Sequence, residues 1–312
     1  MGERGRPRGR QEQAPRKSRH IGVWVVTLML LGVLGAGGYF VYQTFTGGIS
    51  EENCTAVGAD GQSSTIANER MANAATIAAV GRAKSLPERA TIIALATAEQ
   101  ESKIQNLSEG DRDSLGLFQQ RPSQGWGSPE QIQDPVFSTG AFFHALLNVP
   151  HWDTIGVGKA AQAVQRSADS SGESYEQWEE MATILATSLD AKSGTSLTCT
   201  YNDPKLAVET PGTSGLTPRA STLGQALVKQ FSANGVGAAP QYSHSTDGLT
   251  LRITSNNLFS PQVLAAWAVA SSKTLNVDRI QYADQLWTRS SGKWQTTSAT
   301  DKTVDVSVVK GG

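Results

Sequence analysis

An uncharged segment near the N-terminus constrains this chain more than any other feature. No residue from Ile21 to Phe45 carries a charge, and most are Val, Leu, Gly, Phe, Tyr or Met. Such a run exceeds the roughly 20 residues that a helix needs to cross a bilayer core, whereas a secretory signal has an apolar stretch of only about 7–15 residues. The sequence therefore predicts a transmembrane anchor over residues 21–46, with a cleaved signal peptide as the alternative.

The charge distribution predicts the orientation of this anchor. Residues 1–20 hold seven basic and two acidic side chains, while the whole chain has a formal net charge of -1. Because positive flanks stay in the cytoplasm, residues 1–20 are expected to be a cytoplasmic tail and residues from about 47 to be extracytoplasmic. We therefore expect a single-pass protein of the cell membrane. The near-neutral balance argues against nucleic acid as a partner.

Two cysteines lie far apart in the predicted extracytoplasmic part. Cys54 and Cys199 are the only cysteines of the 312 residues. In an oxidising compartment, two cysteines near the ends of one domain are typical of a disulfide, with two unpaired thiols as the alternative. A disulfide would place their Cα atoms within about 7 Å of each other.

The residue pattern divides the part after the anchor into two domains. Residues 52–200 are predicted to be mainly helical, with one helix that Ser63 or Ser64 would cap and another that runs from about Ser85 to Glu101. Residues 201–220 are rich in Pro, Gly, Ser and Thr, a composition typical of a linker. Residues 221–312 are predicted to form a small α+β domain, with a helix over 261–275 and strands near 249–253, 279–288 and 304–309.

One acidic residue ends an apolar stripe of the predicted 85–101 helix. Glu101 follows five small or apolar side chains at helical spacing, namely Ala90, Ile93, Ala94, Thr97 and Ala98. A carboxyl group next to apolar surface suits a general acid for a glycosidic oxygen. Glu99, two residues earlier, is rotated by about 200° and is expected to face solvent. The alternative is that Glu101 is a surface residue at the end of a core helix.

The residues around Glu101 carry a resemblance to a known family. Glu101-Ser102 is followed by Ile104, then by Gly-Leu-Phe-Gln at residues 116–119, then by Pro122. This arrangement resembles the lytic transglycosylase signature, in which a catalytic Glu-Ser precedes Gly-Leu-Met-Gln and a proline. Residues 110–112, Gly-Asp-Arg, also resemble a loop of goose-type lysozymes, which share that fold. The resemblance covers about residues 60–190 and implies a lysozyme-like domain.

The resemblance implies an enzyme that cleaves peptidoglycan without a cofactor or metal. Glu101 would act alone as acid and base on the MurNAc–GlcNAc bond, in a lytic transglycosylase or a muramidase. Asp111 and Asp113 are the nearby candidates for the second carboxylate that an inverting hydrolase needs, and turn chemistry is their alternative role. The remaining candidate substrate-binding residues are Ser102, Gln119 and Trp126, the last of which is better suited to a core.

One departure from the family supports a second hypothesis. The family carries Ala-Tyr-Asn-Ala-Gly in a late helix, where the tyrosine approaches the catalytic glutamate. The corresponding run here is residues 163–167, with Val164 at the tyrosine position, while Gln165 keeps a polar side chain for substrate. The alternative function is a catalytically weak glycan-binding or spacer protein of a cell-envelope assembly, with envelope or secretion-complex proteins as partners.

The C-terminal domain has a fainter resemblance. Residues 264–270, 275–277 and 286–288 resemble part of a zinc D,D-peptidase-like domain. His244 remains near its metal-binding half, but Arg252 stands about where an aspartate ligand belongs. The resemblance therefore implies a degenerate domain without a metal site, for binding or spacing.

Overall fold

The computed structural model describes residues 52–167, 170–190, 196–202, 205–232 and 239–312. These described residues form one compact unit. The expected cytoplasmic tail at residues 1–20 and the expected anchor at residues 21–46 lie outside the described residues.

The expected fold class, a transmembrane helix followed by a mainly α domain and a small α+β domain, must be corrected. None of the helices in the described residues is long and apolar enough to cross a membrane. The longest of them, α2 (Asn68–Ala83), has 16 residues, which span about 24 Å at 1.5 Å per residue against a hydrocarbon core of about 30 Å. The same finding, that none of the described helices could cross a membrane, also corrects the expected location as a single-pass protein of the cell membrane. The described chain is an α+β protein with two antiparallel sheets.

The first sheet joins the two ends of the region that was expected to be mainly helical. It contains β1 (Asn53–Val57), β2 (Ser63–Ala67) and β3 (Leu197–Cys199) in the order β2-β1-β3. Residues 63–67, where a helix start was expected, are paired with β1 instead, and α2 begins at Asn68. Strand β3 pairs with β1 across more than 140 residues, so the local sequence pattern carried no sign of this pairing.

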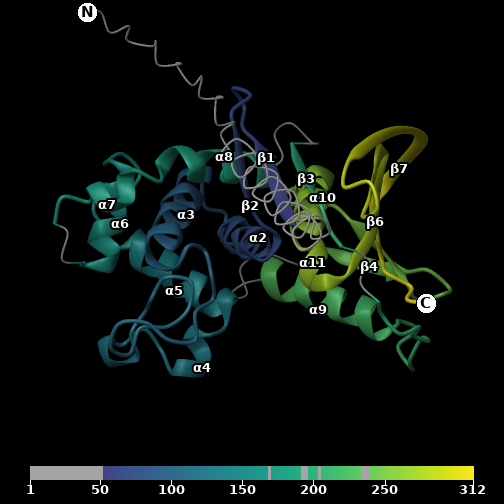
Figure 1. Cartoon of the computed structure of the whole chain (residues 1–312), viewed down its shortest axis with the longest axis horizontal. Helices are drawn as coiled ribbons and strands as arrows, with labels where there is room; N and C mark the ends of the chain where they lie inside the picture. The colour runs from purple at the N-terminus through teal and green to yellow at the C-terminus, as the bar shows by residue number, and fades with distance from the viewer. Residues whose placement is uncertain (1–51, 168–169, 191–195, 203–204, 233–238) are drawn as a thin grey trace, which may run out of the picture. The chain divides into compact units, whose positions relative to one another are not determined.

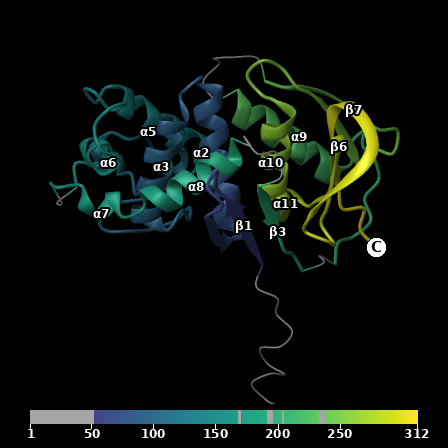
Figure 2. The same cartoon turned by 90° about the horizontal axis from the view of Figure 1, so that it is seen from above.

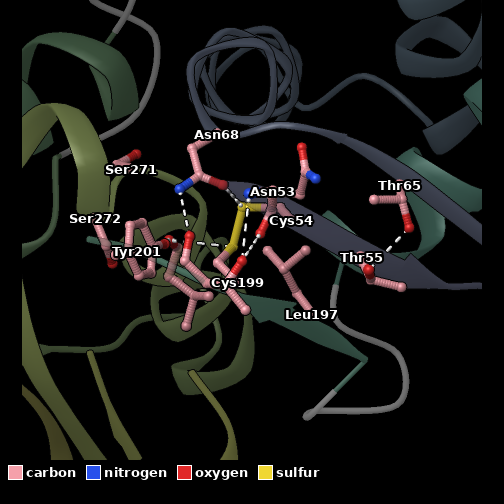
Figure 3. The surroundings of a disulfide bond; sticks show 12 residues. Asn53, Cys54, Thr55, Thr65, Asn68, Leu197, Cys199, Tyr201, Ser271 and Ser272 are labelled. Atoms are coloured by element: carbon pink, nitrogen blue, oxygen red, sulfur yellow. Dashed lines mark hydrogen bonds between the residues drawn. A yellow bond between two sulfur atoms is a disulfide. The ribbon is translucent and has the colours of Figure 1, made fainter. Parts of the chain in front are cut away.

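The predicted disulfide is confirmed. Cys54 and Cys199 lie opposite each other on β1 and β3, and their Cα atoms are 4.0 Å apart (Figure 3). Asn68, the first residue of α2, lies beside the bond and donates its side-chain amide to the Thr200 carbonyl at 2.8 Å. Tyr201 follows on the other side, and its hydroxyl donates to the Val269 carbonyl at 2.9 Å. The disulfide therefore lies where the first sheet meets the C-terminal part of the chain.

Helix α3 (Glu88–Ser102) lies at the centre of the helical region and is covered on most sides (Figure 1 and Figure 2). It contacts α2, α5, α6, α7 and α8. Its many alanines allow these close approaches, because every residue from Ile93 to Glu99 is buried. The surrounding elements are η1 (Pro122–Gln124), α4 (Pro129–Ile132), α5 (Pro135–Leu147), α6 (Val157–Gln165), α7 (Glu173–Glu176) and α8 (Glu179–Leu189).

The C-terminal part contains the second sheet and three helices. Strands β4 (Gln241–His244), β5 (Thr250–Thr254), β6 (Val277–Thr288) and β7 (Trp294–Val308) pair antiparallel in the order β4-β5-β7-β6. The predicted strands are confirmed, and the helix expected over 261–275 is present as α10 (Pro261–Ala270) and α11 (Ser272–Leu275). Helix α9 (Pro218–Phe231) precedes them. In α9 and α10 a hydroxyl caps the N-terminus and a proline follows, a combination that favours a helix start.

The C-terminal part packs directly on the helical region. Helix α2 contacts α9, α10 and α11. Two ion pairs join the same parts, Lys229 with Asp134 at 2.8 Å and Lys273 with Glu52. Helix α10 is buried from Val263 to Ala270 because it contacts β6 and β7 as well as α2 and α8.

Candidate active site

Glu101 lies in the last turn of α3, where the helix leaves the interior. The five residues of the stripe that precedes it are fully buried, whereas Glu101 itself is half-buried. The chain then turns sharply, because Lys103 and Ile104 both have positive φ angles (58° and 55°) and Ile104 returns to the core. This turn leaves Glu101 at the border between the core and a cleft.

Ser102 joins the two halves of the sequence motif. Its side chain is buried, and its Oγ donates to the Leu117 carbonyl at 2.7 Å, which holds the Gly-Leu-Phe-Gln loop against the end of α3. The same oxygen accepts a hydrogen bond from the Gln105 backbone N–H at 3.2 Å. Ser102 therefore positions the loop next to Glu101, and it does not line the cleft, where substrate contact was expected.

The Gly-Leu-Phe-Gln loop is anchored by its apolar residues and presents its last one to the cleft. Leu117 and Phe118 are fully buried, and the Phe118 ring stacks on Phe142 at 4.6 Å between ring centroids. Gln119 has a φ of 47°, and its side chain lines the cleft. A side-chain carbon at Gly110 would overlap the amide oxygen of Gln119, so any larger residue there would displace the glutamine side chain.

The cleft brings together most of the residues that the sequence singled out. It has a volume of about 1180 Å³. Its walls come from the end of α3, the loop that precedes and includes η1, the second half of α5 and the end of α6. Of the predicted catalytic and substrate-binding residues, the structure places the following in its lining: Glu101, Asp111, Gln119, Trp126 and Gln165.

The two candidate second carboxylates differ in their surroundings. Asp113 lies outside the cleft lining and accepts hydrogen bonds from the Arg121 guanidinium at 2.7 Å and from the Ser123 backbone N–H at 2.8 Å. The Arg121 hydrogen bond, with those from Ser123, holds the pKa of the Asp113 carboxyl well below its usual range. Asp113 therefore has the turn-fixing role that was its alternative. Asp111 does line the cleft, and 93% of its side chain is exposed.

A tyrosine hydroxyl contacts Glu101, although it does not come from the expected position. Val164 stands in the cleft lining as an apolar residue. The hydroxyl comes from Tyr175 of α7, which donates to Glu101 Oε1 at 2.7 Å. The Tyr175 ring is only 1% exposed, so its position is fixed by packing. This contact was not predicted from the sequence, in which only the Val164 position was compared with the family tyrosine.

Trp178 also contacts the end of α3. Its indole N–H donates to the side-chain oxygen of Gln100 at 2.8 Å, and the Lys103 ammonium lies 4.3 Å from the centroid of its ring. Tyr175 and Trp178 thus both contact the end of α3. No local sequence signal identified Tyr175, because its contact with Glu101 joins residues 74 apart.

The expectation that Glu99 faces solvent is wrong. Glu99 is 4% exposed and pairs with Arg70 of α2, while its other carboxylate oxygen lies 3.9 Å from the Lys103 ammonium. Glu99 does point away from Glu101, as the roughly 200° rotation along the helix predicts. However, α2 packs on that side of α3, and its Arg70 pairs with Glu99. Glu99 is therefore part of the interior.

Gln165 links the wall of the cleft that α6 forms to the Gly-Leu-Phe-Gln loop at residues 116–119. Its side-chain amide donates to the Phe118 carbonyl at 2.8 Å. Helix α6 ends at this residue, and Arg166 follows with a φ of 51°. The wall that carries Val164 and Gln165 is thus tied to the loop that carries Gln119.

Comparison with known proteins identifies no family for this chain. A scan against protein-family models gives no match. A search of the curated proteins also gives none. The function is therefore inferred from the motif spacing and from the geometry around Glu101.

Proposed function

We propose that this chain is a peptidoglycan-cleaving enzyme that acts on the MurNAc–GlcNAc bond with Glu101 as its single acid and base. The observation that carries the proposal is the position of Glu101 in the wall of a large cleft, with the Tyr175 hydroxyl on one of its carboxyl oxygens at 2.7 Å. A carboxyl group held in this way has a fixed orientation toward the space that a glycan strand would occupy.

The hydrogen bond from Tyr175 determines which oxygen acts. Because the hydroxyl donates to Oε1, the transferable proton belongs on the other oxygen of Glu101. Glu101 would give this proton to the bridging oxygen of the glycosidic bond as that bond breaks. The resulting carboxylate would then take the proton of the C6 hydroxyl while O6 attacks C1, which leaves a 1,6-anhydromuramoyl end.

The acidic residues of the cleft favour this transglycosylase route over hydrolysis. Among the described residues that line the cleft, the acids are Glu101 and Asp111. An inverting hydrolase needs a second carboxylate that is held in place to activate water. Asp111 is almost fully exposed, and its carboxylate lies 3.8 Å from the guanidinium group of the neighbouring Arg112. A muramidase that uses Asp111 is the alternative reaction.

The test is the Glu101→Gln variant of the full chain, incubated with purified sacculi. The released muropeptides would be separated and weighed by mass spectrometry, which distinguishes 1,6-anhydro ends from the reducing ends of a muramidase. Loss of general acid–base catalysis should lower turnover by about 10²–10⁴-fold, while binding to sacculi persists. Glu180→Gln, an exposed position on α8, is the matched control and should retain activity.

Three outcomes would contradict the proposal. Full activity of Glu101→Gln would remove its catalytic role. Binding of sacculi by both the unmodified chain and the variant, without cleavage by either, would favour the glycan-binding function instead. A product with only reducing ends, lost in Asp111→Asn, would replace the transglycosylase with a muramidase.

A further inference from the structure

The cleft carries positive charge on a chain that is otherwise acidic. Its lining contains three arginines, Arg112, Arg121 and Arg166, against the two acids Glu101 and Asp111. The sequence after residue 20 has 20 basic and 26 acidic residues. The cleft lining therefore has a formal excess of one positive charge on a chain that is acidic after residue 20, and exposed arginines in a cleft favour an anionic ligand.

Two of these arginines are available to a ligand. Arg121 is committed to Asp113 through a 2.7 Å hydrogen bond. Arg112 lies 3.8 Å from Asp111, but 70% and 93% of these two side chains are exposed, so water and salt screen the pair. Arg166 forms no ion pair within the part of the chain that the structure describes. Arg112 and Arg166 thus present two guanidinium groups to the cleft.

The backbone holds both arginines in defined places. Arg112 and Arg166 have φ angles of 58° and 51°, a region that non-glycine residues adopt rarely and that is found at ligand sites more often than elsewhere. Gln119, on the same cleft, shares this conformation with a φ of 47°. The Arg166 backbone N–H also donates to the Gln162 carbonyl at 2.7 Å, which closes α6 directly before the side chain enters the cleft lining.

Guanidinium groups recognise carboxylates through two parallel N–H donors, whereas neutral sugar hydroxyls do not require a positive charge. In peptidoglycan, the carboxylates belong to the peptide stems that are attached to alternate sugars. We propose that Arg112 and Arg166 bind carboxylates of these stems, so that the cleft selects glycan strands that carry peptides over bare strands. This proposal rests on the proposed function, because it names the substrate of the same cleft.

The experiment compares two substrates, intact glycan strands and strands from which an amidase has removed the peptides. The unmodified full chain should favour the peptide-bearing strands in kcat/KM by at least about tenfold, the expected effect of one charge-assisted hydrogen bond. In the double variant Arg112→Gln/Arg166→Gln this ratio should fall to about one. Arg279→Gln, an exposed arginine of β6 outside the cleft lining, is the matched control and should keep the ratio.

A second measurement needs no variant. Raising the ionic strength should lower the preference of the unmodified chain, because salt screens exposed charges. An unmodified chain without a preference, or a double variant that keeps it, would overturn the proposal. A preference that disappears when phosphate-containing wall polymers are stripped chemically, with the peptides left in place, would overturn it as well.

Binding assays separate this proposal from the proposed function. If the chain binds peptide-bearing strands preferentially but cleaves neither substrate, the enzymatic function fails and the recognition of carboxylates stands. If it cleaves both substrates equally, the enzymatic function stands and the recognition fails.

Discussion

Replacing Tyr175 with phenylalanine would remove one oxygen atom from the candidate active site and leave its packing intact. The ring is 1% exposed and sits under the end of α3, so phenylalanine fills the same space. The lost group is the hydroxyl that donates to Glu101 Oε1 at 2.7 Å. The variant therefore tests whether this hydrogen bond orients the catalytic carboxyl group.

The size of the effect follows from the kind of bond that is lost. A hydrogen bond to a charged group contributes about 1.5–3 kcal/mol. Each 1.36 kcal/mol of transition-state stabilisation is a factor of ten, so the rate should fall by about 10- to 150-fold if the bond persists through the reaction. The free energy of unfolding should change by less than about 1.5 kcal/mol, because Glu101 is only half-buried and water can replace the hydroxyl.

The assay is the initial rate of muropeptide release from sacculi, measured beside a urea unfolding curve for the same protein. Tyr282→Phe, at another buried tyrosine that lies on β6 and outside the cleft lining, is the control and should keep the rate. An unchanged rate in Tyr175→Phe would refute the orienting role. A rate loss that merely follows the fraction of unfolded protein would refute it as well.

Three further predictions concern stability. Reduction of the Cys54–Cys199 bond, which joins residues 145 apart, should lower the free energy of unfolding by up to about 5 kcal/mol in urea titrations; a loss below about 1 kcal/mol would contradict the chain-entropy argument. Glu99→Gln should lower the free energy of unfolding by about 2 kcal/mol, because it removes the ion pair with Arg70. The loss is smaller than for a fully buried pair, since the Arg70 side chain is 22% exposed. An unchanged free energy of unfolding would indicate that Glu99 is exposed to solvent. The pKa of Asp113 is lower in the folded chain than in the unfolded chain. The ionised carboxylate therefore stabilises the fold at any pH above the ordinary carboxyl pKa, and this stabilisation is lost only as the pH falls to the lowered pKa of the folded chain. The melting-temperature difference between the unmodified chain and Asp113→Asn should therefore persist at pH 4, and its disappearance already at pH 5 would contradict the assigned cause.

The position of Glu101 could be predicted because it depends on local spacing. The small side chains from Ala90 to Ala98 repeat at helical intervals, and this repeat identified both the helix and the face that ends in Glu101. Gln119 follows in a loop whose glycine and apolar residues determine its course. Helix α10 and strands β5, β6 and β7 were predictable for the same reason, since helical spacing and strand alternation are local patterns.

Contacts between distant segments could not be predicted in this way. Strand β3 has three residues and exists as a strand because β1 pairs with it, so no periodicity marked it. Glu99 was assigned to solvent because a single helix does not reveal that α2 covers its side with Arg70. The first sheet was missed in the region expected to be mainly α for the same reason, because the pairing of β1 with β2 and β3 is a property of the folded chain.

The sequence by itself determined which carboxyl group stands at the end of the central helix, which loop follows it and which cysteines pair. These features depend on helical periodicity, on turn-forming residues and on the presence of only two cysteines. Only the tertiary structure decided which hydroxyl reaches Glu101, which acids remain in the cleft and where the arginines lie. Tyr175 lies 74 residues after Glu101, and no local rule relates them, because their 2.7 Å contact exists only once α7 has packed against α3.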